Sequence, residues 1–365
     1  MSSALPYDAV FFVSFGGPEG PDDVVPFMEN VTRGRGIPRE RLVEVSAHYG
    51  LFGGVSPING QNRALIAALE TELALHGIDL PVYWGNRNWT PYLGEALEAM
   101  RADGRERVLA FVTSAFSSYS GCRQYREGIE SARVEIGDGA PVVDKIRVFY
   151  NHPGFVEPMV DNTLAALDAM RARGIVDPEI AFTAHSVPMS MAVSSDYVVQ
   201  LRETARLIDE AVALRTGRTF RTDLVFQSRS GAPGMPWLEP DICDHLESRH
   251  ADGASGVVMV PIGFISDHME VVYDLDTQAR AKAEAIGLPV ERAATVGTDH
   301  RFVSMIRSLI EERIATAQGR SPDRVCIGSR PANHDVCPLD CCPAPQRPAA
   351  TATRDGVPSG RGPVV

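Results

Sequence analysis

The 365-residue sequence lacks long apolar runs, and its first six residues carry no basic region followed by an apolar segment. A helix that spans a membrane needs about 20 consecutive apolar residues, and a secretion signal needs a basic start and an apolar stretch. We therefore expect a cytoplasmic protein with no transmembrane segment. Peripheral contact with a membrane stays open, because these absences do not bear on it.

Positive charge is also scarce. The chain has 47 acidic against 35 basic residues and a formal net charge of -12. Binding to the phosphates of a nucleic acid needs a basic patch, so we expect no nucleic acid as the main partner. The 44% of hydrophobic and 22% of charged residues are typical of a globular protein, and the length suffices for two domains.

Cysteines are few and unevenly placed. Of the six, Cys122 and Cys243 stand alone, and the other four lie between residues 326 and 342. Structural disulfides are rare in the cytoplasm, so clustered cysteines there indicate metal ligands first. Cys243 lies on a predicted helix over 241–247 and is expected to be a small buried residue.

Apolar strand-like runs alternate with helix-period segments along most of the chain. Alternation of this kind predicts βαβ units and parallel sheets. The fold class we expect is α/β, with two similar Rossmann-like halves, each a four-stranded parallel sheet flanked by helices. The predicted strands are 9–14, 81–85, 108–113, 146–150, 179–183, 222–227, 256–261 and 290–293.

The same pattern divides the chain into an N-terminal α/β domain, 1–152, and a C-terminal α/β domain, 153–320. A final helix over 301–317 could pack back on the first domain. A cysteine-rich segment, 321–345, forms a C-terminal extension. The last residues, 346–365, are rich in Pro, Gly, Arg and Thr and are expected to be a disordered tail.

Two segments, 183–188 and 263–276, each follow a predicted strand and carry the most reactive side chains. Ligands bind open α/β sheets at the carboxyl ends of the strands. The first segment supplies His185. If residues 267–276 are helical, the second presents Asp267, Glu270 and Asp274 on one face.

Like charges at that spacing weaken a helix, so a bound cation is one explanation for the acidic face. Histidine with carboxylates suits Fe(II) or Zn(II), whereas Ca(II) and Mg(II) favour oxygen ligands alone. A solvated acidic face with two ordinary surface histidines explains the spacing equally well. A nucleotide site has little support, because the glycine turn at 14–18 is not a G-x-G-x-x-G motif.

Seven motifs, in one order and at one spacing, resemble the ferrochelatase family, and the resemblance runs along residues 8–318. Within the family the chain is similar to the actinobacterial branch. That resemblance implies a chelatase-like fold and insertion of Fe(II) into coproporphyrin III to give iron–coproporphyrin III. Protoporphyrin IX is the alternative substrate, and a non-catalytic tetrapyrrole carrier is the alternative function. The motifs are SFGGP at 14–18, RGR at 33–35, GGVSP at 53–57, TAHSVP at 183–188, QSRSG at 227–231, PWL at 236–238 and GFISDHME at 263–270.

The resemblance also assigns the central residues. It implies that His185 is the metal ligand and proton acceptor on one side of the bound ring. Glu270 would lie in the same metal site, opposite or alongside. Asp267, His268 and Asp274 would form the adjoining path for delivering Fe(II) or removing protons. An imidazole with its ordinary pKa of about 6.5 could accept a proton near neutral pH.

Further positions match segments that contact the porphyrin in the family. Ser56 and Tyr125 match residues that bind propionates, and three more lie in neighbouring segments: Arg33, His48 and Tyr49. Phe15 stands where relatives carry tyrosine. Because phenylalanine has no lone pair, Phe15 cannot be an axial ligand, although it still belongs to the expected substrate site. Phe226 similarly replaces a tryptophan.

Some ferrochelatases hold a 2Fe–2S cluster with one cysteine of the first domain and three near the C-terminus. By resemblance, the ligands here are Cys122, Cys326, Cys337 and Cys342, or Cys341 in place of Cys342. Four thiolates suit such a cluster. The alternatives are a zinc site, which the missing C-x-x-C pairs disfavour, and free thiols. Transient contact with neighbouring enzymes of the haem pathway is also expected.

Overall fold

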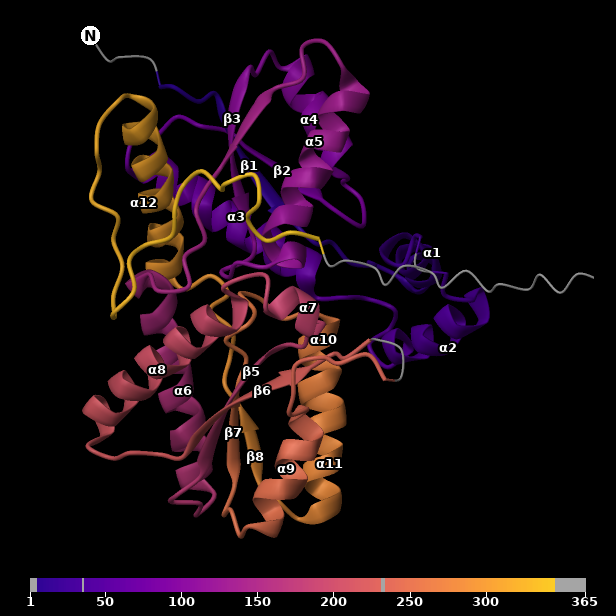
Figure 1. Cartoon of the computed structure of the whole chain (residues 1–365), viewed down its shortest axis with the longest axis vertical. Coiled ribbons are helices and arrows are strands. Elements are labelled where there is room, and N and C mark those ends of the chain that lie inside the picture. Colours follow the sequence, from indigo (N-terminus) through magenta and orange to yellow (C-terminus); the bar gives the residue numbers. More distant parts are fainter. Residues whose placement is uncertain (1–4, 35, 231–233, 345–365) are drawn as a thin grey trace, which may run out of the picture.

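The computed structural model describes residues 5–34, 36–230 and 234–344, so the expected tail at 346–365 lies outside the described residues. Two four-stranded parallel sheets, in the orders β2-β1-β3-β4 and β6-β5-β7-β8, confirm the predicted α/β class. The two orders are equivalent, so the halves share one topology. Figure 1 shows the first sheet above the second. The strands are β1 (Ala9–Ser14), β2 (Val82–Asn86), β3 (Arg107–Val112), β4 (Val142–Lys145), β5 (Glu179–His185), β6 (Thr222–Gln227), β7 (Val257–Val260) and β8 (Val290–Arg292).

The fourth strand differs from its prediction. We expected residues 146–150, but β4 pairs with β3 through residues 142–145. The chain leaves the sheet after the backbone N–H of Ile146 donates to the Ala110 carbonyl at 2.9 Å. Residues 146–150 are nevertheless almost fully buried, Phe149 being 1% exposed. Their apolar character therefore reflects packing between the halves and not strand pairing, which the sequence pattern cannot distinguish.

Helices cover both faces of each sheet. Helices α4 and α5 pack on the outer face of the first sheet, and α9, α11 and the π-helical turn η2 on that of the second. None of the described helices is long and apolar enough to cross a bilayer. The helices are α1 (Pro21–Val31), α2 (Arg39–Gly50), α3 (Ile58–Leu75), α4 (Leu93–Ala102), η1 (Tyr119–Arg123), α5 (Gln124–Ile136), α6 (Pro153–Ala172), α7 (Met189–Ala192), α8 (Tyr197–Thr216), α9 (Ile242–Ala251), α10 (Met269–Val272), η2 (Asp274–Ala279), α11 (Arg280–Ile286) and α12 (His300–Ala317).

A single apolar core runs between the halves. It contains Phe12 and Phe111 from the first sheet and Phe182 from the second, each at most 1% exposed. Helix α12 packs against α3 of the first half and α6 of the second. The Phe302 ring of α12 lies 5.8 Å from Phe149, and Arg307 Nε lies 2.9 Å from a carboxylate oxygen of Glu72 on α3. The final helix therefore belongs to both halves.

After α12 the extension returns across the molecule (Figure 1, yellow) and is fixed by buried polar groups. Arg147, 2% exposed, forms two bonds of 2.8 and 3.0 Å to the Glu312 carboxylate. Its guanidinium also donates to the Val325 carbonyl at 2.9 Å. Further along, the Ser329 backbone N–H donates to Glu203 of α8 at 3.0 Å. These contacts lead the cysteine-rich segment back toward the first half.

Candidate active site

The carboxyl ends of β5 and β6 and the loop after β7 bring the predicted site residues together. His185 ends β5, and Gln227 ends β6. The loop after β7 crosses close to β5, and a Cβ at Gly263 would lie 2.7 Å from the Ala184 Cα. Only glycine allows this close approach, which brings the chain toward His185.

His185 and Glu270, separated by 85 positions, form the centre of the site. His185 Nε2 lies 3.0 Å from Glu270 Oε1, and the side chains are 31% and 45% exposed. The other ring nitrogen, Nδ1, contacts the Ser186 carbonyl. Since a carbonyl only accepts hydrogen bonds, Nδ1 carries a proton. Nε2 is therefore the ring atom that faces Glu270. It is also the atom of His185 that would bind a metal ion or exchange a proton.

The charge state of His185 differs from that of an ordinary histidine. Burial lowers its pKa, but the charge and hydrogen bond of Glu270, with the Ser186 carbonyl and Asp274, outweigh this and raise the pKa to about 9. At neutral pH His185 is therefore an imidazolium that faces Glu270. With this raised pKa the ring gives up a proton before it accepts one, and the role of His185 as proton acceptor stays a prediction.

His268, next to the pair, has the opposite behaviour. Its Nδ1 accepts from the Glu270 backbone N–H at 3.2 Å and so caps α10. Burial lowers the pKa of this imidazole, against the attraction of Glu270. The site thus holds one protonated and one neutral imidazole on either side of a shared carboxylate.

Asp274 is the third titrating group. It lies on η2 and accepts a hydrogen bond from the Ser228 hydroxyl. Burial, together with the charge of Glu270, raises the pKa of Asp274 to about 7, although Ser228 and His185 oppose the rise. A carboxyl group with this pKa exchanges protons at neutral pH, as a catalytic acid or base must.

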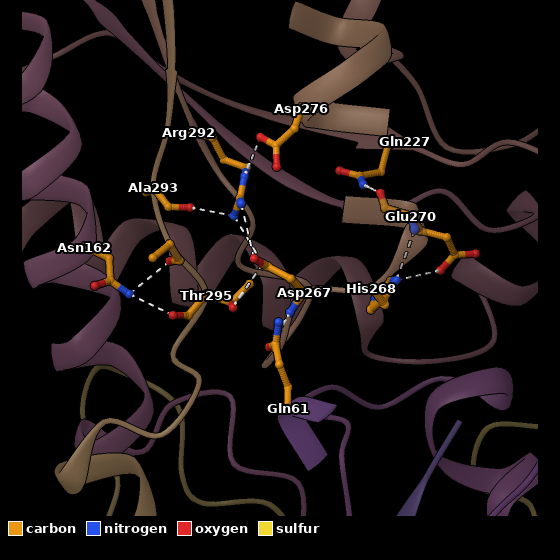
Figure 2. Close-up of polar contacts among 11 residues, drawn as sticks. Gln61, Asn162, Gln227, Asp267, His268, Glu270, Asp276, Arg292, Ala293 and Thr295 are labelled. Carbon is orange, nitrogen blue, oxygen red and sulfur yellow. Dashed lines mark hydrogen bonds and ion pairs between the residues drawn. The ribbon is translucent and has the colours of Figure 1, made fainter. Parts of the chain in front are cut away.

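Asp267 does not share the helical face that its spacing predicted. α10 has four residues, and the π-helical turn η2 follows, so the continuous helix over 267–276 is wrong. A π-helical turn changes which residues share a face. The Asp267 carboxylate instead receives two bonds of 3.2 Å from Arg292 (Figure 2). Its negative charge is therefore already compensated.

Aromatic rings surround the charged group. The charges of Glu270 and Asp274 add to burial in raising the pKa of Tyr49, and Glu270 acts in the same way on Tyr125 and Tyr197. These rings belong to α2, α5 and α8, so elements of both halves face one acidic pair. The Tyr197 hydroxyl donates to the His185 carbonyl at 3.0 Å, which fixes the end of β5.

The other predicted substrate residues lie on the first half. Ser56 is buried, and the His48 ring stacks on Tyr273 at 4.1 Å. Tyr273 precedes Asp274, so the stack joins α2 to the acidic segment. Arg33 is exposed, and its charge acts on the phenol of Tyr92.

Arg87 was missed by the sequence analysis. Its guanidinium lies 5.1 Å from the ring centres of both Phe15 and Tyr125. It also donates to the Ser120 carbonyl at 3.3 Å and to Gln124 at 3.1 Å. Arg87 directly follows β2, so the same rule of strand ends that indicated His185 could have found it. Tyr197, which begins a helix, gives no such signal.

Four thiols gather where the extension meets η1. The Cys122 thiol donates a hydrogen bond to Cys337, which lowers the pKa of Cys337 to about 7 and raises that of Cys122. Cys341 Sγ lies 3.7 Å from Cys342 Sγ. Arg123 holds this segment through the Leu339 carbonyl at 3.1 Å.

This group has the donors of a metal centre. Ligand atoms of His334, Cys337 and Cys341 all lie within 4.8 Å of one another, and Cys122 adds a further thiol. Cys342, on which the charges of Cys341 and Cys122 act, brings the thiols to four, the number that holds an iron–sulfur cluster once they are deprotonated. Cys326 lies beside Tyr150, on whose phenol its charge acts.

Comparison with known proteins gives consistent matches. A family model described as ferrochelatase matches residues 7–314. Coproporphyrin III ferrochelatases of Streptomyces coelicolor and Streptomyces griseus are 57% and 56% identical, over 95% and 96% of this chain and 96% and 97% of theirs. A ferrochelatase of Rhodopirellula baltica is 51% identical over 97% of this chain and 99% of its own. The cobalt complex of the Bacillus subtilis sirohydrochlorin chelatase has the same fold, with a TM-score of 0.51, 9% identity and coverage of 86% and 97%.

Proposed function

The chain belongs to the ferrochelatase family, and on this basis we propose that it inserts Fe(II) into coproporphyrin III in haem biosynthesis. The observation that carries the proposal is the His185–Glu270 contact of 3.0 Å, formed within a chain that is 57% identical to a coproporphyrin III ferrochelatase. An imidazole and a carboxylate together suit Fe(II). A carrier that only holds a tetrapyrrole would not need titrating groups beside that pair.

Insertion requires that the ring lose two N–H protons as Fe(II) enters, so the site needs groups that accept protons. Glu270 lies beside His185, and Asp274 acts on both through its charge. Asp274 has a pKa of about 7 and can pass protons to solvent. We assign His185 and Glu270 to the bound Fe(II) and Asp274 to proton removal. We assign Asp267 to holding the loop and not to delivering iron.

Residues of the first half are proposed to bind the periphery of the ring. Tyr125 and Phe15 present aromatic surface, and Arg87 between them presents a guanidinium suited to a propionate. Ser56, His48 and Tyr49 stay predictions from the family resemblance, and so does Arg33. Coproporphyrin III has four propionates against two in protoporphyrin IX, so donors at the periphery favour the former.

We further propose a 2Fe–2S cluster at the thiols of the extension. When bound, it would supply redox-active iron and a covalent link between η1 and the extension. The contacts favour Cys122, Cys337, Cys341 and Cys342 as ligands, whereas the family resemblance predicted Cys326 among them. The two ligand sets are distinguished with anaerobically purified Cys341→Ser and Cys326→Ser proteins. For each variant, visible absorbance and acid-labile sulfide are measured. Loss of both signals in Cys326→Ser but not in Cys341→Ser would contradict the contact-based set.

The activity is tested by anaerobic incubation with Fe(II) and each porphyrin, following the loss of free-base fluorescence. We expect faster loss with coproporphyrin III and no turnover in His185→Ala. The matched control is His300→Ala, because that side chain is 87% exposed. Binding of coproporphyrin without loss of fluorescence in the parent protein would indicate the carrier. Insertion by His185→Ala at the parent rate would remove His185 from the mechanism.

A cytoplasmic location and transient contact with other enzymes of the pathway stay predictions. Fractionation of cells, followed by crosslinking of the intact protein, tests both.

A further inference from the structure

Arg292, at the end of β8, binds two carboxylates that flank the active segment. Its Nη1 and Nη2 lie 3.2 Å from the two oxygens of Asp267, and its Nε lies 2.7 Å from Asp276 (Figure 2). The Arg292 side chain is 15% exposed, and those of Asp267 and Asp276 are 23% and 28% exposed. A guanidinium has the fixed, planar donors that such a double contact needs.

The two partners lie on either side of the residues that carry the chemistry. Asp267 precedes α10, which carries Glu270, and Asp276 lies on η2, which carries Asp274. An isolated four-residue helix is not stable by itself. The position of Glu270 relative to His185 therefore depends on contacts outside α10, and Arg292 supplies one at each end of the segment.

The Asp267 end is fixed by two further groups. The Thr295 hydroxyl donates to the Asp267 carboxylate at 3.2 Å. The backbone N–H of Asp267 donates to the Gln61 side-chain oxygen at 2.8 Å (Figure 2). Gln61 belongs to α3 of the first half, so the loop is tied to both halves. At Glu270 itself, Gln227 donates to the backbone carbonyl.

We propose that Arg292 is a positioning residue, which holds the segment 267–276 by both ends so that Glu270 and Asp274 face His185. Its pairing with Asp267 and Asp276 compensates the charges of these two carboxylates, which flank Glu270 and Asp274. Arg292 acts on this segment through Asp267 and Asp276. The proposal rests on the proposed insertion of Fe(II).

The first test is a split of kinetic constants in the full-length protein. In Arg292→Gln we expect kcat to fall about 100-fold, because a displacement near 1 Å of a catalytic group has that effect. KM for coproporphyrin III should stay within about threefold, since the residues proposed to bind the periphery of the ring belong to the first half and Arg292 belongs to the second. Arg292→Lys should recover part of kcat, since an ammonium can keep one of the two carboxylates.

Arg173→Gln is the matched control, because Arg173 also binds β8, donating to the Val290 carbonyl at 3.0 Å, without contacting 267–276. Hydrogen exchange gives a readout that does not depend on activity. Amides of 267–276 should exchange faster in Arg292→Gln than in the parent or in Arg173→Gln. Asp276→Asn, a milder change, should show the same effect at the η2 end if Arg292→Gln does not fold.

Two kinetic results would overturn the proposal. One is an unchanged kcat in Arg292→Gln, with or without a higher KM, and the other is an equal loss of kcat in Arg173→Gln. Unchanged exchange in 267–276 would do the same. Failure of the parent protein to insert Fe(II) is a different outcome. It removes the proposed function, while the exchange data still report whether Arg292 holds the segment.

Discussion

Replacing Glu270 with glutamine tests the electrostatics at the centre of the site. The rise in the pKa of His185 from 6.5 to about 9 corresponds to about 3 kcal/mol in favour of the imidazolium. That value is an upper bound, since the side chain is 31% exposed and solvent screens part of the interaction. Glutamine keeps the shape of Glu270 and removes its charge, while the burial that lowers the pKa remains. The Ser186 carbonyl and Asp274 also remain and still favour the imidazolium, so the pKa of His185 in Glu270→Gln should fall from about 9 toward 6.5.

Imidazole NMR titration measures this directly. The protein has nine histidines, and the spectrum of His185→Gln assigns the resonance. Glu284→Gln, which removes an exposed carboxylate of α11, is the control and should leave the titration unchanged. A pKa for His185 that stays above 8 in Glu270→Gln would refute the view that Glu270 holds the proton there.

The same pair predicts how stability depends on pH. The folded pKa of His185, about 9, lies above the unfolded value of 6.5, so the stabilising contribution is complete below pH 6.5 and disappears as pH rises through 9. The difference in unfolding free energy between the parent protein and Glu270→Gln should be largest near pH 6 and should shrink by pH 10. Urea unfolding at both pH values measures it. A difference that does not change with pH would contradict the coupling.

Two further predictions concern other groups. Glu312→Gln leaves the buried charge of Arg147 without its carboxylate partner, so the free energy of unfolding in urea should fall by about 3–5 kcal/mol. The double change Arg147→Met with Glu312→Leu should restore most of this loss. A loss below about 1 kcal/mol would show that solvent screens the ion pair. Because burial raises the pKa of Asp274 to about 7, it gains its charge as pH rises through that value. The insertion rate should therefore fall as the pH drops below 7. Asp274→Asn should lack this dependence when the rate is measured between pH 5.5 and 8.5. A decrease at low pH that persists in the variant would belong to another group.

Much of the fold and the core of the site could be predicted from the sequence. Buried parallel strands are continuous apolar runs, and those of this chain indicated the strands of both sheets other than β4. The rule that ligands bind at strand ends placed His185 beside the acidic segment, where the structure has Glu270 at 3.0 Å. Both inferences use patterns local to the chain.

The remainder depended on contacts between distant residues. The helical spacing of Asp267, Glu270 and Asp274 assumed a regular helix, but η2 interrupts it and Arg292 from β8 captures Asp267. The pKa of His185 likewise depends on the balance between burial and a carboxylate 85 positions away. A single sequence contains no measure of either effect.

The core shared by the two halves determines how the protein loses its structure. Domains joined by small, polar interfaces move and melt separately, but here Phe12, Phe182 and Phe302 belong to one apolar cluster that α12 completes. The two sheets should therefore unfold in one cooperative calorimetric transition and not in two. On this expectation no intermediate keeps one half folded, and activity should be lost at the temperature at which the whole chain unfolds.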